Sequence, residues 1–241
     1  MLNELTKKTS DPAVEQQWID MKIPELKVLS KAPSFGFGNV LANYSFLAFL
    51  QYFGDEARAT EGYSLTFSFF EPIVAHDPRY RDFYLFLSGA GSTYAGDPAR
   101  SVELMDKGLS QLAPNEPPNG YYIWRYKGTD ELLFLNDGKS AQKSFEMAAK
   151  WAHESSDEAA STVGKVSEQT AQFLADNPAS KLAQINAWGS ILTTALDDET
   201  RKRAITRIQA LGGDVVIGGD GQLQIKYAQV EETPGGGKPD S

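Results

Sequence analysis

Apolar residues recur at steps of three and four along most of the chain, which is the spacing of one face of an α-helix. The first such segment starts at Asp11-Pro12 and is expected to end at Pro24, because proline is disfavoured inside a helix. A strongly apolar segment from Val40 to Tyr52 follows and closes at Gly54-Asp55. The same periodicity predicts further helices at 64–75, 79–95, 98–112, 121–135, 139–153, 159–175, 180–196 and 199–211.

The period changes after Gly212-Gly213. Two short β-rich runs flank the glycines at 218–221, which predicts a small β-hairpin over 214–228. Asp198 is expected to cap the start of the predicted helix at 199–211, which precedes the hairpin. The glycine- and proline-rich tail at 229–241 is expected to be disordered. The predicted order is therefore a lead-in with one short helix (1–35), a helical repeat region (36–155), a helical capping region (156–213), the hairpin and the tail.

Turn signals divide the repeat region into helical hairpins. Gly96-Asp97-Pro98 lies between the two predicted helices of one hairpin. Asn136-Asp137-Gly138 lies between the two predicted helices of the next hairpin. A two-helix unit that returns along the chain is typical of helical repeat proteins.

The residues within these hairpins resemble the tetratricopeptide repeat family over about 38–153. Small and aromatic residues stand at the family's helix-packing positions, namely Trp124, Gly128, Ala141, Phe145 and Ala148 in one copy and Gly89, Ser101, Met105 and Gly108 in another. The resemblance implies an all-α fold, a right-handed array of antiparallel helical hairpins that ends in the small β-hairpin. Two departures are Glu131, where the family has a tyrosine, and His153, where it has a proline.

Two further stretches, 46–55 and 130–134, resemble exported repeat proteins of cyanobacteria. This resemblance implies a location in the periplasm or thylakoid lumen, which is favoured over the cytoplasm. It also implies that the protein acts on a membrane complex, for which a photosynthetic complex is one candidate. The first 30 residues show no signal peptide, and no stretch is apolar enough to cross a bilayer. Membrane association is therefore expected only through a partner or a removed leader.

Composition excludes several chemistries. Among 241 residues there is no cysteine and there are two histidines, so disulfides, thiolate metal sites and histidine-rich centres are not expected. The net charge of −9 argues against a general binder of nucleic acid, which needs a basic surface. Asp214 and Asp220 lie near glycines, but without the alternating acids of a calcium loop. We expect no metal and no cofactor.

No catalytic motif is evident, so the sequence predicts a protein that is not an enzyme. Gly36-Phe-Gly38 lacks the third glycine of a dinucleotide-binding loop, and 89–92 lacks the lysine of a phosphate loop. His76 and Asp77 are adjacent, and neighbouring residues rarely face each other, so Asp77 is expected to cap a helix. His153 is expected to interact with the carbonyls at a helix end.

The aromatic residues at 121–126 are the main candidates for a binding surface. Tyr121 and Trp124 share one helix face and Tyr122 and Tyr126 another, so one pair is expected in the core and the other is available for a groove. Helical arrays bind extended peptides or helices in such grooves, although packing between repeats explains the same residues. The candidate partner-binding residues are Tyr122, Arg125, Tyr126, Lys127 and Arg79.

An acidic stretch at 150–200 holds eight Asp or Glu against three Lys or Arg. It is interpreted as a solvated face, with a basic partner as the alternative. The sequence as a whole predicts a scaffold for protein–protein interaction that acts as an assembly factor for a larger complex. The alternatives are a stoichiometric subunit of such a complex, or a helical enzyme or ligand-binding domain with a pocket joining Asp77, Arg79 and Arg125.

Overall fold

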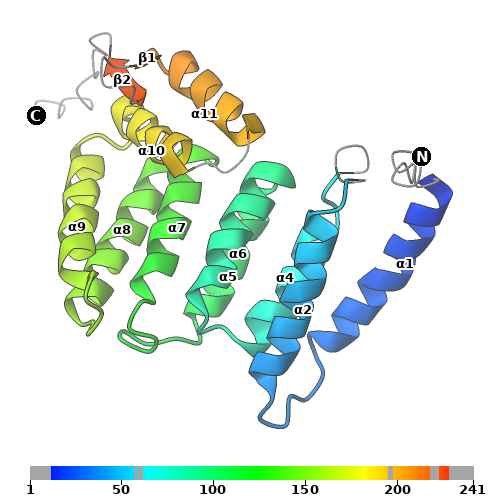
Figure 1. Ribbon diagram of the computed structural model, residues 1–241. Helices are drawn as coiled ribbons and strands as arrows, with labels where there is room; N and C mark the ends of the chain where they lie inside the picture. The colour runs from blue at the N-terminus through cyan, green and yellow to red at the C-terminus, as the bar shows by residue number, and fades with distance from the viewer. Residues whose placement is uncertain (1–11, 57, 59–61, 195–197, 218–222, 228–241) are drawn as a thin grey trace, which may run out of the picture. The chain divides into compact units, whose positions relative to one another are not determined.

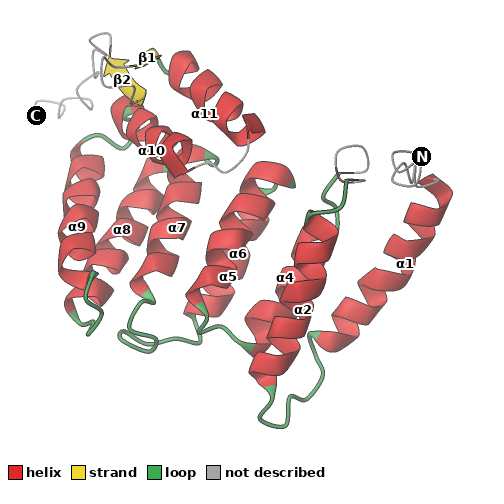
Figure 2. Cartoon of the chain, viewed as in Figure 1, coloured by secondary structure: helices red, strands yellow, loops and turns green. Residues whose placement is uncertain are grey.

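The computed structural model describes residues 12–56, 58, 62–194, 198–217 and 223–227. Over these residues the chain is all-α with a small two-stranded antiparallel sheet, as the sequence predicts, and it contains ten α-helices and one π-helical segment (Figures 1 and 2). The chain forms two compact units, residues 1–123 and 124–241, and the boundary lies inside the predicted repeat region. The turn at 218–221, the tail, and the side chains of Val14 and Asp198 lie outside the described part.

Unit 1 is built around an aromatic core. Its elements are α1 (Pro12–Leu29), α2 (Gly38–Phe53), α4 (Thr66–His76), α5 (Arg81–Leu87), the π-helix η1 (Ser88–Tyr94) and α6 (Pro98–Leu109); α7 (Tyr121–Leu133) crosses the boundary to unit 2. The Phe49 ring of α2 lies 4.7 Å from Phe70 and 6.2 Å from Phe69, centroid to centroid. These edge-to-face contacts hold α2 against α4.

The prediction that the first helix ends at Pro24 is wrong. α1 continues through Pro24 to Leu29, because its last turn is anchored by tertiary contacts. Leu26 is buried, and the Leu29 carbonyl lies 2.7 Å from Nε2 of His76 at the end of α4. In the tautomer with a proton on Nε2, His76 donates a hydrogen bond there, so this histidine joins two helices rather than pairing with Asp77.

The predicted helix at 79–95 has a change of pitch. It is α-helical at 81–87 and π-helical at 88–94, and the N–H of Ala95 donates to the carbonyl of Ala90, 2.8 Å away. The wider turn places Gly91 against Ser101 and Phe67, whereas a Cβ at Gly89 would meet no atom within 4 Å. The close approach therefore lies two residues after the glycine that the repeat pattern selects.

Aspartates at the two turn signals cap the helices that follow. Asp97 accepts a hydrogen bond from the N–H of Arg100 (3.1 Å) at the start of α6. Asp137 accepts from both the N–H (3.0 Å) and the hydroxyl (2.7 Å) of Ser140 at the start of α8. These bonds from Ser140 hold the pKa of Asp137 below its ordinary value. The repeated turn chemistry therefore defines where both helices begin.

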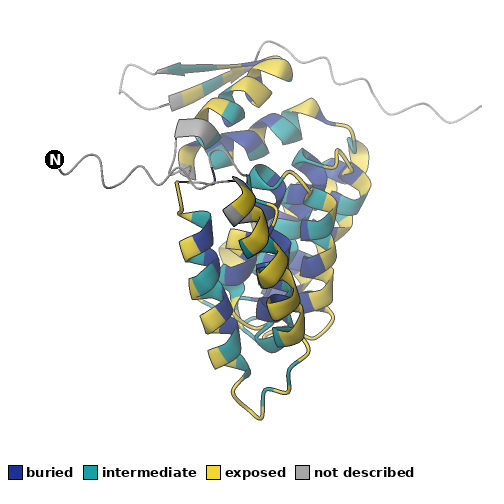
Figure 3. Ribbon diagram, turned by 90° about the vertical axis from the view of Figure 1, so that its right-hand side faces the viewer, coloured by how far each residue is buried: buried dark blue, intermediate teal, exposed yellow. Residues whose placement is uncertain are grey.

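Unit 2 continues with α8 (Gly138–His153), α9 (Ala160–Asp176), α10 (Lys181–Thr194), α11 (Asp198–Ala210) and the strands β1 (Gly213–Ile217) and β2 (Leu223–Tyr227). The strands pair antiparallel with Val215 opposite Ile225. One cluster of buried residues joins α7, α8 and α9, and another joins α10 and α11. Figure 3 shows the buried residues gathered on the faces of helices that meet their neighbours.

Gly138 provides a stability test, because a Cβ there would overlap the backbone carbonyl of Pro178, between α9 and α10. We expect Gly138→Ala to lower the free energy of unfolding by about 1–3 kcal/mol, as overpacking does. The control is Gly89→Ala, where a Cβ meets nothing and the change should stay within about 0.5 kcal/mol or stabilise. Urea unfolding followed by circular dichroism measures both, and equal effects would contradict the close approach.

A second test concerns Tyr84 of α5, whose hydroxyl donates to the Pro78 carbonyl (2.9 Å). Burial, and secondarily the charge of Asp77, raise the pKa of Tyr84 above its ordinary value. Above about pH 10 an unfolded chain loses a proton from this tyrosine and the folded chain does not, so stability falls as the pH rises. Urea midpoints at about pH 8 and about pH 10.5 should therefore differ less for Tyr84→Phe than for the natural protein; an unchanged difference would refute the assignment.

Candidate functional site

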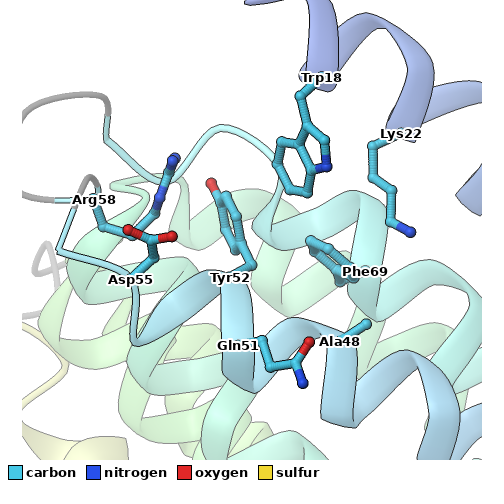
Figure 4. Close-up of a pocket in the computed structure, with 8 residues that line it drawn as sticks. All are labelled: Trp18, Lys22, Ala48, Gln51, Tyr52, Asp55, Arg58 and Phe69. Carbon is cyan, nitrogen blue, oxygen red and sulfur yellow. The ribbon is translucent and has the colours of Figure 1, made fainter. Parts of the chain in front are cut away.

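The first hollow lies in unit 1, between α1, α2 and the segment after α2 (Figure 4). It has a volume of about 470 Å³ and is lined by Trp18, Lys22, Ala48, Gln51, Tyr52, Asp55, Arg58 and Phe69. The Trp18 ring stacks on Tyr52 with centroids 6.0 Å apart, and the Arg58 guanidinium lies 4.5 Å from the Tyr52 centroid. The two aromatic rings thus connect α1 to α2.

The cations of this hollow make contacts within the chain. Lys22 Nζ lies 2.7 Å from a carboxylate oxygen of Glu25. Arg58 is buried, and its Nη1 donates to the Gly62 carbonyl at 2.9 Å. Each cation is held by its own segment, Lys22 within α1 and Arg58 within the segment after α2, while the Trp18–Tyr52 stack joins the two helices, so we interpret this hollow as structural.

The second hollow lies in unit 2 and is called here the α7–α10 groove. It has a volume of about 520 Å³, within the range of ligand pockets, and takes its walls from four helices. The lining residues are Arg125, Thr129, Leu132, Phe145, Val166, Gln169, Thr170, Phe173, Leu182, Ala183, Asn186, Ala187, Ser190 and Ile191.

Arg125 is the one ionisable side chain in that lining. Its Nη1 donates to the Ser167 hydroxyl (2.7 Å), and its guanidinium lies 5.8 Å from the centroid of Phe145. The Ser167 hydroxyl in turn donates to the Val163 carbonyl (2.7 Å). α9 and α8 thereby hold the cation in one position at the groove wall.

The rest of the groove combines apolar surface with uncharged hydrogen-bonding groups. Phe173, Leu182 and Ile191 supply apolar contacts, and Gln169 and Asn186 supply amides on facing helices. Apolar contacts bury the side chains of a bound segment, while amides and hydroxyls can bond to its backbone. This arrangement suits a peptide segment rather than a small polar ion.

Of the five predicted binding residues, the structure places Arg125 in the groove. Lys127 does not face it: its Nζ lies 2.9 Å from a carboxylate oxygen of Glu131 and 5.4 Å from the Trp124 centroid. Both side chains of this ion pair are nearly buried, with 12% and 4% exposed. Lys127 is therefore a partner for a buried carboxylate and not a groove cation.

The same contact explains the departure of Glu131 from the repeat pattern. Its Oε2 accepts a hydrogen bond from the Ser144 hydroxyl (2.6 Å), and Lys127 neutralises its charge. A buried carboxylate is tolerated when it is both paired and hydrogen-bonded. Glu131 thus joins α7 to α8.

The other predicted binding residues lie elsewhere. The Tyr122 ring lies 4.6 Å from Tyr121 and 4.9 Å from the guanidinium of Arg81, within unit 1. Tyr126 is half-buried and lines neither hollow, and Arg79 is exposed, with its N–H donating to Asp77 (3.3 Å). They do not converge on one site within either unit.

The residues that the repeat pattern selects, except Gly89, lie at contacts between helices. Trp124 meets Trp151 edge to face at 5.9 Å, and Ala141 and Ala148 are fully buried. A Cβ on Gly128 would come within 3.1 Å of Phe145, and one on Gly108 would overlap Tyr84. Gly89, as described above, makes no such contact; Ser101 and Met105 are buried.

Sequence reasoning missed the groove residues of α9 and α10. The available signal was a pair of polar residues four apart on α10, Asn186 and Ser190, together with Val166, which is 45% exposed on α9. His153, at the end of α8, is exposed and lies 3.9 Å from Glu168.

The described residues contain no group of three His, Cys, Asp or Glu that could hold a metal. Among them there is also no helix with the length and apolar character to cross a membrane. Comparison of the chain with protein families, with curated proteins and with solved structures gives no match.

The ion pair of Lys127 and Glu131 yields a prediction. Glu131→Leu removes the carboxylate that lies 2.9 Å from the nearly buried ammonium of Lys127, so we expect a loss of about 3–5 kcal/mol in unfolding free energy. The double variant Lys127→Met/Glu131→Leu should recover part of this loss, because it removes both charges of the pair. Urea titration of both variants measures the coupling, and additive losses would contradict it.

Proposed function

We propose that this protein is a non-enzymatic scaffold that binds a protein partner in the α7–α10 groove. The observation that carries the proposal is the lining of the groove, which is largely apolar, open and supplied with a single cation, Arg125. No nucleic acid is proposed as partner, because the net charge of −9 disfavours phosphate backbones.

The lining suggests the chemistry of the bound segment. Apolar side chains would fill the space beside Phe173, Leu182 and Ile191, and the Gln169 amide would bond to the backbone of the bound segment. A carboxylate, from an acidic side chain or a chain end, would complement Arg125. We therefore propose a short apolar segment with one acidic group.

The absence of converging titratable groups in the lining favours binding over catalysis. Acid–base chemistry needs a group that exchanges protons near neutral pH, and an arginine does not do so. The enzymatic alternative required Asp77 and Arg79 in a pocket with Arg125, and neither hollow is lined by Asp77 or Arg79.

The cellular role follows from the resemblance in the sequence. We propose that the partner belongs to a larger complex, membrane-bound or photosynthetic, and that this protein helps the complex to assemble. We further propose that this protein is exported and that it reaches the membrane through its partner. A tetratricopeptide-like arrangement of the hairpins is part of the same proposal.

A photocrosslinking residue at Val166 tests the groove. Val166 lies in the groove and is 45% exposed, so its replacement should not disturb folding. In native cells we expect the probe to crosslink to one protein, and Val166→Glu to lower recovery of that protein at least tenfold. Leu135→Glu, a similar change at an exposed residue outside the groove, is the control.

Two outcomes would overturn the proposal: no crosslinked protein at Val166, or equal recovery with the Val166→Glu and Leu135→Glu variants. The stoichiometry of the recovered complex separates the two roles. A fixed ratio in the mature complex indicates a subunit, and presence only in immature complexes indicates an assembly factor.

A further inference from the structure

The outer face of α2 exposes a row of apolar residues, called here the α2 seam. It consists of Phe37, which precedes the helix, with Val40, Tyr44 and Leu47, and these side chains are 65%, 56%, 55% and 62% exposed. The steps of three, four and three residues place them on one side of the helix. Such spacing is the pattern by which a helix packs against another helix.

The seam lies on a helix that is fixed from behind. The opposite face of α2 buries Ala42, Ser45, Phe49 and Tyr52 in the core of unit 1. The seam is therefore a preformed surface, and binding there would not require a loop to become ordered.

The turn before α2 adds a strained element to the same region. Phe35 has a φ of 48° and Gly36 a φ of 88°, and the N–H of Phe37 donates to the Ser34 carbonyl (2.7 Å). A bulky residue in the left-handed region is uncommon, and here it leaves the Phe35 side chain 84% exposed. Strain of this kind is concentrated at functional positions.

The seam also stands out by its charge. From Ala32 to Gly54 the chain carries no Asp, Glu, Lys, Arg or His, although 23% of the whole chain is charged. The exposed neighbours of the seam on α2, Asn39, Asn43 and Gln51, are uncharged as well. A solvent-facing helix ordinarily carries charges on its outer face, so this one is suited to an uncharged surface.

The charge pattern selects among the possible occupants. An interfacial helix that binds anionic lipid has Lys or Arg beside its apolar face, and α2 has none. Two copies of a chain with a net charge of −9 repel each other, and the repulsion is smallest where the surfaces that meet are neutral. Across a two-fold axis the same surface patch faces itself, so a neutral seam matches a second copy of itself.

The exposed area is sufficient for the centre of such an interface. At roughly 150–250 Å² per aromatic side chain, the seam and Phe35 expose on the order of 600 Å². That is at the upper end of the largest apolar patch on a typical monomer. A stable interface covers about 800 Å² per partner, and the neutral residues around the seam would supply the remainder.

We propose that two copies of this chain associate through the α2 seam, with the two α2 helices antiparallel across a two-fold axis near Tyr44. Tyr44 lies nearest the axis because it stands near the middle of the seam. The interface is distinct from the α7–α10 groove, so a dimer would present two partner-binding grooves.

Sedimentation equilibrium of the full chain from low micromolar to millimolar concentration tests the dimer. We expect a reversible monomer–dimer equilibrium, and a dissociation constant at least tenfold higher for Tyr44→Glu, which places two carboxylates near the axis. Leu135→Glu, at an exposed apolar position in unit 2, should leave the equilibrium unchanged. Tyr44 is half exposed, so circular dichroism should show both variants folded.

Mixing two charge variants makes the test specific for a second copy. Tyr44→Glu and Tyr44→Lys should each be largely monomeric alone and should form a mixed dimer when combined. The natural protein staying monomeric at millimolar concentration would overturn the proposal. A mixture of the two variants that does not associate would also overturn it. A third contrary result would be that the monomer binds vesicles of phosphatidylcholine and phosphatidylglycerol and that Tyr44→Glu abolishes this binding.

Discussion

Several glycines among the described residues lie where a Cβ would overlap a neighbouring element, and the packing depends on them. Gly38 meets the end of α4, Gly108 meets Tyr84, and Gly138 meets the turn after α9. At each point a Cβ would overlap a neighbour, so the two backbones could not come as close. Because helix spacing is set there, the same contacts determine which helix faces are buried and which remain for binding.

Local signals in the sequence predicted the turns at 96–98 and 136–138, and the structure adds that an aspartate in each turn caps the helix that follows. Asp97 and Asp137 cap helices because an aspartate before a helix accepts the first free N–H groups, and that requires only adjacent residues. The all-α fold and the hairpin after Gly212 follow from periodicity in the same way. Pro24 was misleading because its cost is offset by Leu26 and by the bond between His76 and Leu29, a contact between distant residues.

The candidate site was predicted only in part, for the same reason. Arg125 lies in the groove, but the sequence could not show that the cation two residues later is held by Glu131. Helix periodicity assigns residues to a face without saying which neighbour covers that face. The groove walls from α9 and α10 depend on how four helices meet, and no single segment contains that information.

The π-helical segment at 88–94 has a consequence for comparing sequences. A π-turn takes in one more residue than an α-turn, so the chain holds the equivalent of an insertion inside a helix rather than in a loop. The residues before Ser88 and those after Tyr94 therefore cannot both be aligned, without a gap, to a repeat motif of fixed length. An alignment of this chain with a regular helical repeat needs its gap within the helix, a place where gaps are ordinarily forbidden.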